Sequence, residues 1–445
     1  MLMAGKNATT DGSVMIAHNN DLTGKEASLL EKIDSVVTAD SLHFPSGLNI
    51  PVFKTNYTML ILRIADGFSE GDAVAINENM VAIGGGVALG DDRNKKAAAC
   101  DTLITKGLTG GIRYYALRDV KSAKELVSLI GSLYTEYGVT YPSGIAIADT
   151  REIWYMESGG GRMWAAVRVP DDACMIIANG YRIGKINFDD RNNFMTAPGL
   201  LEFCKKNKLV ETTATSINFA NVFGRGRENR NYDTHRVWRG ITLINDSLNI
   251  SPDDKTFPMF VKPKEKITSA KMFSILRDQY EGTPYSLDKT SGERLIASSA
   301  TVHSSLVQLK SKTLKEIGAV LWAGMGNPKY TVYLPFYFGL TDIPDAYEKA
   351  GKEFDARSAF WNFKDLNDKI EKIDLKHREA ISARLRTFES RVIRSQEKTL
   401  EKYQQFRSKD FKTASDFLNK YLESLAENTM KIIKIISADL EKVIK

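Results

Sequence analysis

The chain has few of the residues on which metal sites and disulfide frameworks depend. Its 445 residues include only three cysteines (Cys100, Cys174 and Cys204) and five histidines. No CxxC pair and no HExxH motif occurs among them, and a disulfide framework or zinc site needs such spacing. The sequence therefore predicts no metal site and no cofactor, and we expect the cysteines to be small buried hydrophobic residues.

Long apolar runs and concentrated basic stretches are also missing. No window approaches the roughly 18 apolar residues of a membrane span. The net charge is +6 and is spread along the chain, whereas a nucleic-acid-binding protein usually carries a basic stripe with interleaved aromatic residues. We therefore expect binding neither to membranes nor to nucleic acid. The opening residues do not form a signal peptide, so the sequence as given predicts a cytoplasmic protein, and a signal peptide ahead of Met1 would make it an exported one.

Short strand signals and a few helical segments follow one another through the chain. Hydrophobic residues make up 43% of it, enough for a large core. Apolar residues fall at helical spacing in residues 122–137, and a second helix is expected at 268–280. Strand signals fill much of the first half and return at 295–308 and 319–323. This order predicts an α+β fold with largely antiparallel sheets.

The composition changes near residue 362. From Asn362 to the end, Lys, Glu, Arg and Leu dominate, and neither Gly nor Pro occurs. This pattern predicts one or two long helices, and hence a division into a domain of residues 1–361 and a helical extension of residues 362–445. We expect the extension to pack on the domain or on a neighbouring subunit, which leaves a homo-oligomer open.

Six stretches of the sequence occur in the order found in one known family. They are residues 5–21 (GKNATTDGSVMIAHNND), 75–86 (AINENMVAIGGG), 178–190, 231–244, 276–286, and 294–309 taken together with 320–339. In these stretches the chain resembles the C69 (U34) dipeptidases, and the resemblance extends to about residue 345. It implies the fold of the N-terminal-nucleophile hydrolases, a four-layer αββα sandwich of two facing antiparallel sheets with helices outside.

The resemblance also implies a nucleophile. In this superfamily the first residue of the mature chain is a cysteine whose thiolate attacks the substrate carbonyl, while its own α-amine serves as the base. Aligning the Gly-Lys pair of the family with Gly5-Lys6 places that cysteine just upstream of Met1. Met1 cannot replace it, because a thioether has no ionisable proton. Either a cysteine precedes Met1, which we favour, or the protein is a non-catalytic relative.

Two polar residues are candidates for the catalytic machinery. By the resemblance, Asp21 orients the nucleophile, and the alternative is an exposed turn aspartate. Asn179 ends an apolar strand, and by the resemblance its amide donates to the oxyanion. The alternative for Asn179 is a turn residue ahead of Gly180.

Three further residues are candidates for substrate binding. His18 stands where relatives often carry an arginine, and Asn20 where they carry a glutamate, so the charge of the pocket departs from the family pattern. His303 alternates with Thr301 and Ser305 on one face of a predicted strand, and its alternative is a core histidine with its hydrogen bonds satisfied. We interpret the neighbouring pair His235 and Arg236 as mainly structural.

The sequence thus predicts a cysteine-type dipeptidase that hydrolyses short peptides without metal or cofactor. A small peptide is the expected partner. Two alternatives stay open. One is an acylase of the same fold that acts on a non-peptide amide, such as a conjugated bile acid or a penicillin. The other is a catalytically silent binding or scaffold protein that uses its C-terminal helices for interaction.

Overall fold

The computed structural model describes residues 1–35, 41–51, 55–65, 73–90, 92–225, 230–289 and 292–444. Two antiparallel sheets form the centre of the protein. Within these residues the smaller sheet has the order β12 (Cys174–Ile176), β1 (Leu2–Ala4), β2 (Val14–Asp21), β14 (Thr301–Leu309), β15 (Ala319–Met325) and β16 (Leu334–Tyr337). The larger sheet has the order β13 (Phe194–Thr196), β11 (Met163–Val169), β10 (Ile153–Gly160), β9 (Ser143–Ala148), β8 (Ala82–Ala88), β7 (Ala73–Asn77), β6 (Met59–Ile64) and β3 (Ser28–Ile33). A separate hairpin pairs β4 (Ser41–His43) with β5 (Asn49–Pro51).

The two sheets lie face to face, with β2 stacked on β8 and β9. Glycines in β8 allow the close approach. A Cβ atom added at Gly84 would lie 2.1 Å from Cγ2 of Ile16, and one added at Gly85 would lie 2.4 Å from Nδ1 of His18. Gly85 also has a φ of +99°, which favours glycine. The run of three glycines therefore brings the backbone of β8 against the side chains of β2.

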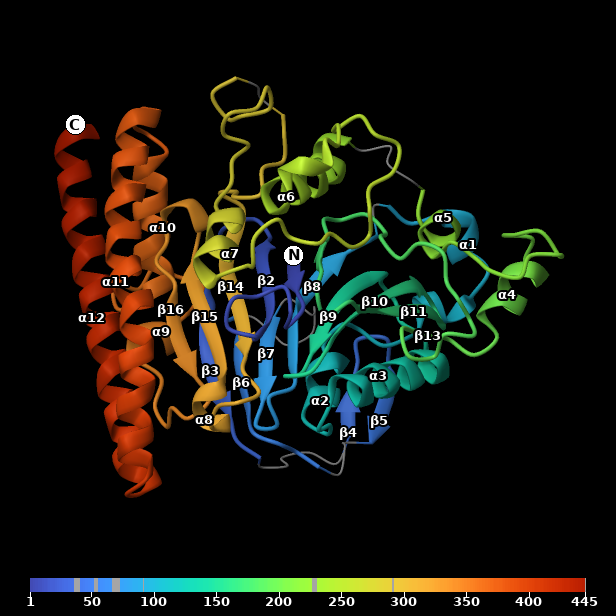
Figure 1. The fold of residues 1–445 in the computed structure, drawn as a ribbon, viewed down its shortest axis with the longest axis horizontal. Coiled ribbons are helices and arrows are strands. Elements are labelled where there is room, and N and C mark those ends of the chain that lie inside the picture. The colour runs from blue at the N-terminus through green and yellow to red at the C-terminus, as the bar shows by residue number, and fades with distance from the viewer. Residues whose placement is uncertain are drawn as a thin grey trace.

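Helices cover the outer faces of both sheets (Figure 1). The helices are α1 (Lys95–Ala98), α2 (Ile112–Leu117), α3 (Ala123–Tyr137), α4 (Leu200–Lys206), α5 (Phe219–Phe223), α6 (His235–Ile244), α7 (Ser269–Leu276), α8 (Lys315–Gly318), α9 (Asp345–Glu348), α10 (Ala359–Ile370), α11 (Leu375–Arg407) and α12 (Phe411–Ile444). On the larger sheet, α3 packs against β9, β10 and β11, and on the smaller sheet α7 packs against β2 and β14. Strands β9, β10 and β14 are buried along their whole length. Strands β9 and β14 each have the other sheet on one face and a helix on the other, whereas β10 is covered by the helices α1 and α3.

The C-terminal region is helical, as predicted. The orange and red helices α11 and α12 run side by side at one edge of the molecule (Figure 1), and α12 also contacts α10 and β16. A buried ion pair attaches α11 to the sheets: Arg277 donates to the Glu389 carboxylate over 2.8 and 2.6 Å, and the same carboxylate accepts from the Tyr333 N–H at 2.9 Å. The division at residues 361 and 362 stays a prediction, and α10, which begins at Ala359, runs across it.

The α+β class with antiparallel sheets is confirmed, and several predicted elements lie where expected. Helix α3 begins after Ser122, whose hydroxyl caps the N–H of Glu125. The predicted helix at 268–280 stops at Leu276 instead, because Asp278 accepts from the Tyr280 N–H and Tyr280 has a φ of +62°. Of the cysteines, Cys174 and Cys204 are buried, whereas Cys100 is partly exposed. No helix in the described ranges combines the length and the apolar character that crossing a bilayer requires.

Candidate active site

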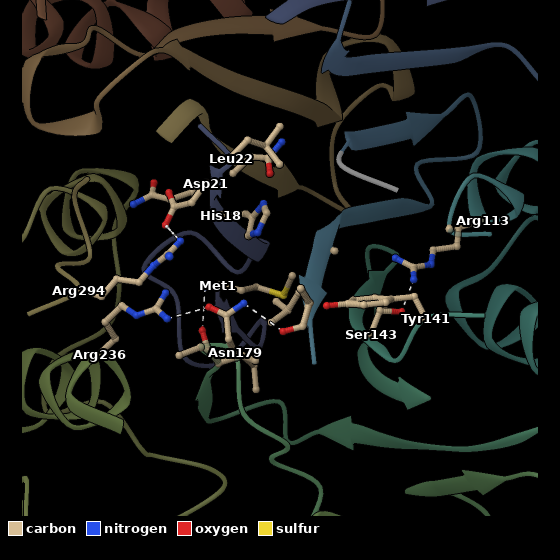
Figure 2. Close-up of a pocket in the computed structure, with 18 of the residues that line it drawn as sticks. Met1, His18, Asp21, Leu22, Arg113, Tyr141, Ser143, Asn179, Arg236 and Arg294 are labelled. Carbon is tan, nitrogen blue, oxygen red and sulfur yellow. Dashed lines mark hydrogen bonds and ion pairs between the residues drawn. The ribbon is translucent and has the colours of Figure 1, made fainter. Parts of the chain in front are cut away.

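A cavity of about 300 Å³ opens where the N-terminal end of β1 meets the C-terminal ends of β2 and β12 (Figure 2). Its walls come from residues distant in sequence: Met1, residues 18–22, 86–88, 109–110, Arg113, residues 140–141, Ser143, residues 177–179, Arg236 and Arg294. The cavity is therefore formed by strands of both sheets and by the helices α2 and α6 that flank it.

Asp21 lies at the C-terminal end of β2 and borders this cavity. Its Oδ1 accepts a hydrogen bond from the Thr301 hydroxyl at 2.6 Å, and its Oδ2 accepts one from Arg294 at 3.0 Å. Thr301 is also the residue that pairs with Asp21 across the β2–β14 ladder. The carboxylate is thus fixed by a neighbouring strand and by an arginine, and it is not an exposed turn residue.

Asn179 follows β12 and lies on the same cavity wall. Its Nδ2 donates to the Ala88 carbonyl at 3.0 Å, and its Oδ1 accepts from Arg236 at 2.7 Å. A primary amide nitrogen carries two N–H donors, so this nitrogen is able to serve a ligand as well as Ala88. The sequence predictions for Asp21 and Asn179 concerned residues 158 positions apart, and the structure brings both to one cavity.

Two carboxylates hold the segment that follows Asn179. Glu157 accepts from the N–H groups of Arg182 at 2.6 Å and Ile183 at 3.1 Å, and Asp92 accepts from the Tyr181 N–H at 3.0 Å. Burial raises the pKa of Glu157 to about 7 and that of Asp92 to about 6, against the opposing effect of these hydrogen bonds. Sequence reasoning did not identify either residue, because nothing in the strand pattern around Glu157 indicates which loop it supports.

The main-chain nitrogen of Met1 lies among these groups. It donates to the Ile177 carbonyl at 2.9 Å, which continues the ladder between β1 and β12. Burial and, to a smaller extent, the charge of Arg236 lower the pKa of the amine there to about 5, against the opposing effect of Asp21. An amine in this environment is neutral at neutral pH and is able to accept a proton.

His18 and Asn20 border the cavity, and their role in substrate binding stays a prediction. Both are buried side chains on β2. Burial, the Met1 amine and His303 together lower the pKa of His18 well below its usual value of 6.5. At neutral pH His18 therefore carries no charge. It does not supply the positive charge of the arginine that relatives often carry at this position.

His303 is not among the residues that line the cavity. Its side chain is 0% exposed, and its Nδ1 is 2.9 Å from the hydroxyl of Ser28 on β3, so the contact joins the two sheets. Burial lowers the pKa of His303 to about 3. Its role in substrate binding stays a prediction. Its burial is that of a core histidine, but its Nε2 has no hydrogen-bond partner among the described residues, so its hydrogen bonds are not all satisfied.

Three arginines that were not predicted as site residues line the cavity. His235 packs as expected, with its ring 4.5 Å from that of Tyr285 and its Nδ1 2.9 Å from Glu293. Arg236, interpreted as structural, instead borders the cavity together with Arg294 and Arg113. Arg236 and Arg294 fall within the stretches that carry the family resemblance, so the resemblance could have indicated that they belong to the site. Arg113 lies outside them.

No group of three or more His, Cys, Asp or Glu side chains suited to a metal ion occurs among the residues that the structure describes.

The sequence model of Peptidase family C69 matches residues 1–381. This chain belongs to peptidase family C69. The C69 match includes every residue that lines the cavity.

Several curated relatives of this C69 chain are named as dipeptidases. A "Probable dipeptidase" of Latilactobacillus sakei is 29% identical over 81% of this chain and 78% of its own length. A "Probable dipeptidase" of Salmonella dublin is 30% identical over 76% of this chain and 80% of its own length. A "Probable dipeptidase B" of Streptococcus pyogenes serotype M1 is 22% identical over 98% of this chain and 91% of its own length, so this match extends into the C-terminal helices.

Proposed function

We propose that the protein is a cysteine-type dipeptidase that acts through an N-terminal nucleophile, on the four-layer αββα sandwich of that superfamily. The nucleophile is a cysteine that precedes Met1 in the natural chain. One observation carries the proposal: the nitrogen of Met1 lies in the cavity within the electrostatic influence of Asp21 and Arg236. We expect a residue joined to that nitrogen to enter the same cavity. Membership of family C69 and the names of the relatives support the peptidase activity.

The proposed reaction begins with transfer of the thiol proton to the α-amine of the same cysteine. The resulting thiolate attacks the peptide carbonyl carbon, and a carbon–sulfur bond forms. The amine then gives its proton to the leaving amino group as the carbon–nitrogen bond breaks. Water hydrolyses the acyl-enzyme and regenerates the thiol. An α-amine has an ordinary pKa of about 8, so part of it is unprotonated at neutral pH and able to accept the thiol proton.

Two residues have supporting roles in this scheme. The Nδ2 of Asn179 donates to the oxyanion, and its position is fixed by Ala88 and Arg236. The carboxylate of Asp21 orients the nucleophile and stabilises the ammonium that forms when the amine accepts the proton. The hydrogen bonds from Thr301 and Arg294 keep Asp21 in one rotamer for this task.

The cavity favours a small substrate. Its volume of about 300 Å³ lies at the lower end of the range of small-molecule pockets, roughly 300 to 1,000 Å³. A dipeptide fits this size better than the steroid of a conjugated bile acid. A small peptide is therefore the proposed partner, in preference to the bulkier amides that an acylase would accept.

The experiment is a hydrolysis panel on the protein purified from its natural source. Dipeptides of varied sequence are compared with penicillin V and with glycine-conjugated bile acids, and released amino acids are measured by mass spectrometry. We expect dipeptides to be cleaved in the presence of a chelator and to be spared after alkylation of the protein with iodoacetamide. Cleavage of the other amides alone would make the protein an acylase. No cleavage of any amide would leave the binding-protein alternative.

A further inference from the structure

Tyr141 is an aromatic residue whose side chain is exposed beside the cavity. It is 50% exposed. Among the residues that the structure describes, it is the only large apolar side chain that is both exposed and part of the cavity wall. A single exposed aromatic residue needs no explanation elsewhere on a protein surface. Here, however, the residue borders the space in which the substrate is proposed to bind.

The backbone next to Tyr141 is held by the larger sheet. The ladder between β8 and β9 ends with Ala88 opposite Ser143. One further hydrogen bond, from the Leu89 N–H to the Pro142 carbonyl at 3.1 Å, extends this alignment. Continuing the antiparallel register by one more residue places Tyr141 opposite the residue that follows Leu89.

That residue is Gly90, and the ring of Tyr141 lies on it. A Cβ atom added at Gly90 would be 2.2 Å from the Tyr141 hydroxyl oxygen, 2.3 Å from Cζ and 2.6 Å from Cε2. One edge of the ring therefore lies directly against the glycine backbone, and a side chain at position 90 would push the ring away. The glycine thus fixes the place of a ring that is otherwise half exposed.

Tyr141 and Asn179 contact the same short segment of the chain. The Nδ2 of Asn179 donates to the Ala88 carbonyl at 3.0 Å, and Gly90 follows Ala88 by two residues, which span at most about 7.6 Å between Cα atoms. This span is comparable with a dipeptide that carries a long side chain, because its two Cα atoms are already about 3.8 Å apart. In Figure 2, Tyr141 lies on the opposite side of the cavity from Arg236.

We propose that Tyr141 determines the side-chain preference of the enzyme by packing against a large apolar side chain of the substrate, and this inference rests on the proposed dipeptidase function. The contact uses the face of the ring and not the hydroxyl. Burying the half-exposed ring against apolar atoms removes both from water, and aromatic rings gain further from offset or edge-to-face pairing. The substrate class is thus dipeptides that carry a large apolar residue, and best an aromatic one.

The first test compares Phe-Ala and Ala-Phe with Ala-Ala, in the wild type and in variants at position 141. The measured quantity is the selectivity, the ratio of kcat/KM for a Phe-containing dipeptide to kcat/KM for Ala-Ala. We expect the wild type to prefer at least one Phe-containing dipeptide, and Tyr141→Ala to lower this ratio roughly 3- to 30-fold. Tyr141→Phe retains the ring and should keep the ratio.

Two further variants separate the position of the ring from other effects. Gly90→Ala moves the ring without removing it, because the added Cβ would overlap its hydroxyl end. We expect Gly90→Ala to change the selectivity when Tyr141 is present and to leave it unaltered in the Tyr141→Ala background. Phe354→Ala removes an exposed ring that does not line the cavity, and it should keep the selectivity of the wild type.

Three results would overturn the inference while continued hydrolysis of Ala-Ala leaves the dipeptidase function intact. They are a wild type that prefers neither Phe-containing dipeptide, an unchanged ratio in folded Tyr141→Ala, and a Gly90→Ala effect of equal size with and without Tyr141. If the wild type cleaves none of the dipeptides, calorimetric titration tests Tyr141 without turnover. Tighter binding of a Phe-containing dipeptide than of Ala-Ala, lost in Tyr141→Ala, would then support the inference, and equal binding or no binding would overturn it.

Discussion

The guanidinium of Arg294 lies 3.0 Å from the Oδ2 of Asp21, and the two residues come from positions 273 apart in the chain. Thr301, on the strand that pairs with β2, holds the other carboxylate oxygen at 2.6 Å. The carboxylate faces the cavity that Met1 also borders. A group held in this way from two sides is suited to orienting a neighbouring amine and thiol.

Replacing Asp21 should therefore affect activity far more than stability. Asp21→Asn keeps the size of the side chain and removes the charge that stabilises the ammonium, so we expect kcat/KM on dipeptides to fall roughly 100-fold or more. The partly exposed ion pair with Arg294 contributes little to stability, about 1 kcal/mol. Asp172→Asn, at an exposed ion pair with Lys262, is the control. Similar activity in both variants would remove Asp21 from the mechanism.

Asn179 should contribute to kcat and not to KM. Removal of one oxyanion donor typically lowers kcat by about 10²- to 10³-fold. We expect Asn179→Ala to show a loss of this size with little change in KM, in steady-state kinetics on a dipeptide. Asn193, whose Nδ2 donates to Asp190 in an exposed turn, gives the control variant Asn193→Ala. A rise in KM at constant kcat would instead assign Asn179 to substrate binding.

Glu157 should make stability depend on pH. Burial raises the pKa of this carboxyl from 4.5 to about 7 in the folded protein. An acid with a raised pKa in the folded state favours folding while it is protonated, so stability falls as the pH rises from about 4.5 to 7. The shift corresponds to roughly 3 kcal/mol.

Urea unfolding at pH values of about 5 and 8 measures this effect. Relative to the Glu157→Gln variant, the wild type should lose up to about 3 kcal/mol between the two pH values. The other titrating groups are shared by the two proteins and largely cancel. Glu202→Gln, at an exposed position on α4, should behave as the wild type does. Parallel pH profiles of the wild type and Glu157→Gln would contradict the prediction.

The ion pair between Arg277 and Glu389 should be essential for attaching α11. Breaking a buried pair from one side costs about 3 to 5 kcal/mol, because the remaining charge stays buried. We therefore expect Glu389→Gln to lower the free energy of unfolding by about this amount. Glu401→Gln, on the exposed face of the same helix, should change it by less than about 0.5 kcal/mol. Equal stability of the two variants would show that α11 is held by apolar packing alone.

Local patterns were sufficient for much of the fold. The spacing of apolar residues gave α3, because Ser122 caps a helix whose buried side chains recur on one face. The expected strand at 295–308 begins only at Thr301, because the backbone before it bonds outside the sheet: the Ala297 N–H donates to the Asp278 carbonyl at 3.0 Å. Helix and strand signals do not register such contacts between distant segments.

The site was predictable where a motif carried it. Asp21 and Asn179 were identified through family stretches, and the structure brings them to one cavity. Arg113, which lines the cavity, and Glu157 were not identified, because their positions depend on packing between elements far apart in sequence. His303 alternates with polar neighbours along β14, but this pattern could not show that Ser28 of the opposite sheet occupies the space in front of it.

The most direct test of the central claim is the N-terminal sequence and intact mass of the protein purified from its natural source. The account predicts that the mature chain begins with a cysteine ahead of Met1, and that one equivalent of iodoacetamide at this cysteine abolishes dipeptide hydrolysis. A mature chain that begins at Met1 or Leu2 would contradict the nucleophile assignment. Family membership would stand, and the cavity would then be a binding site without the proposed chemistry.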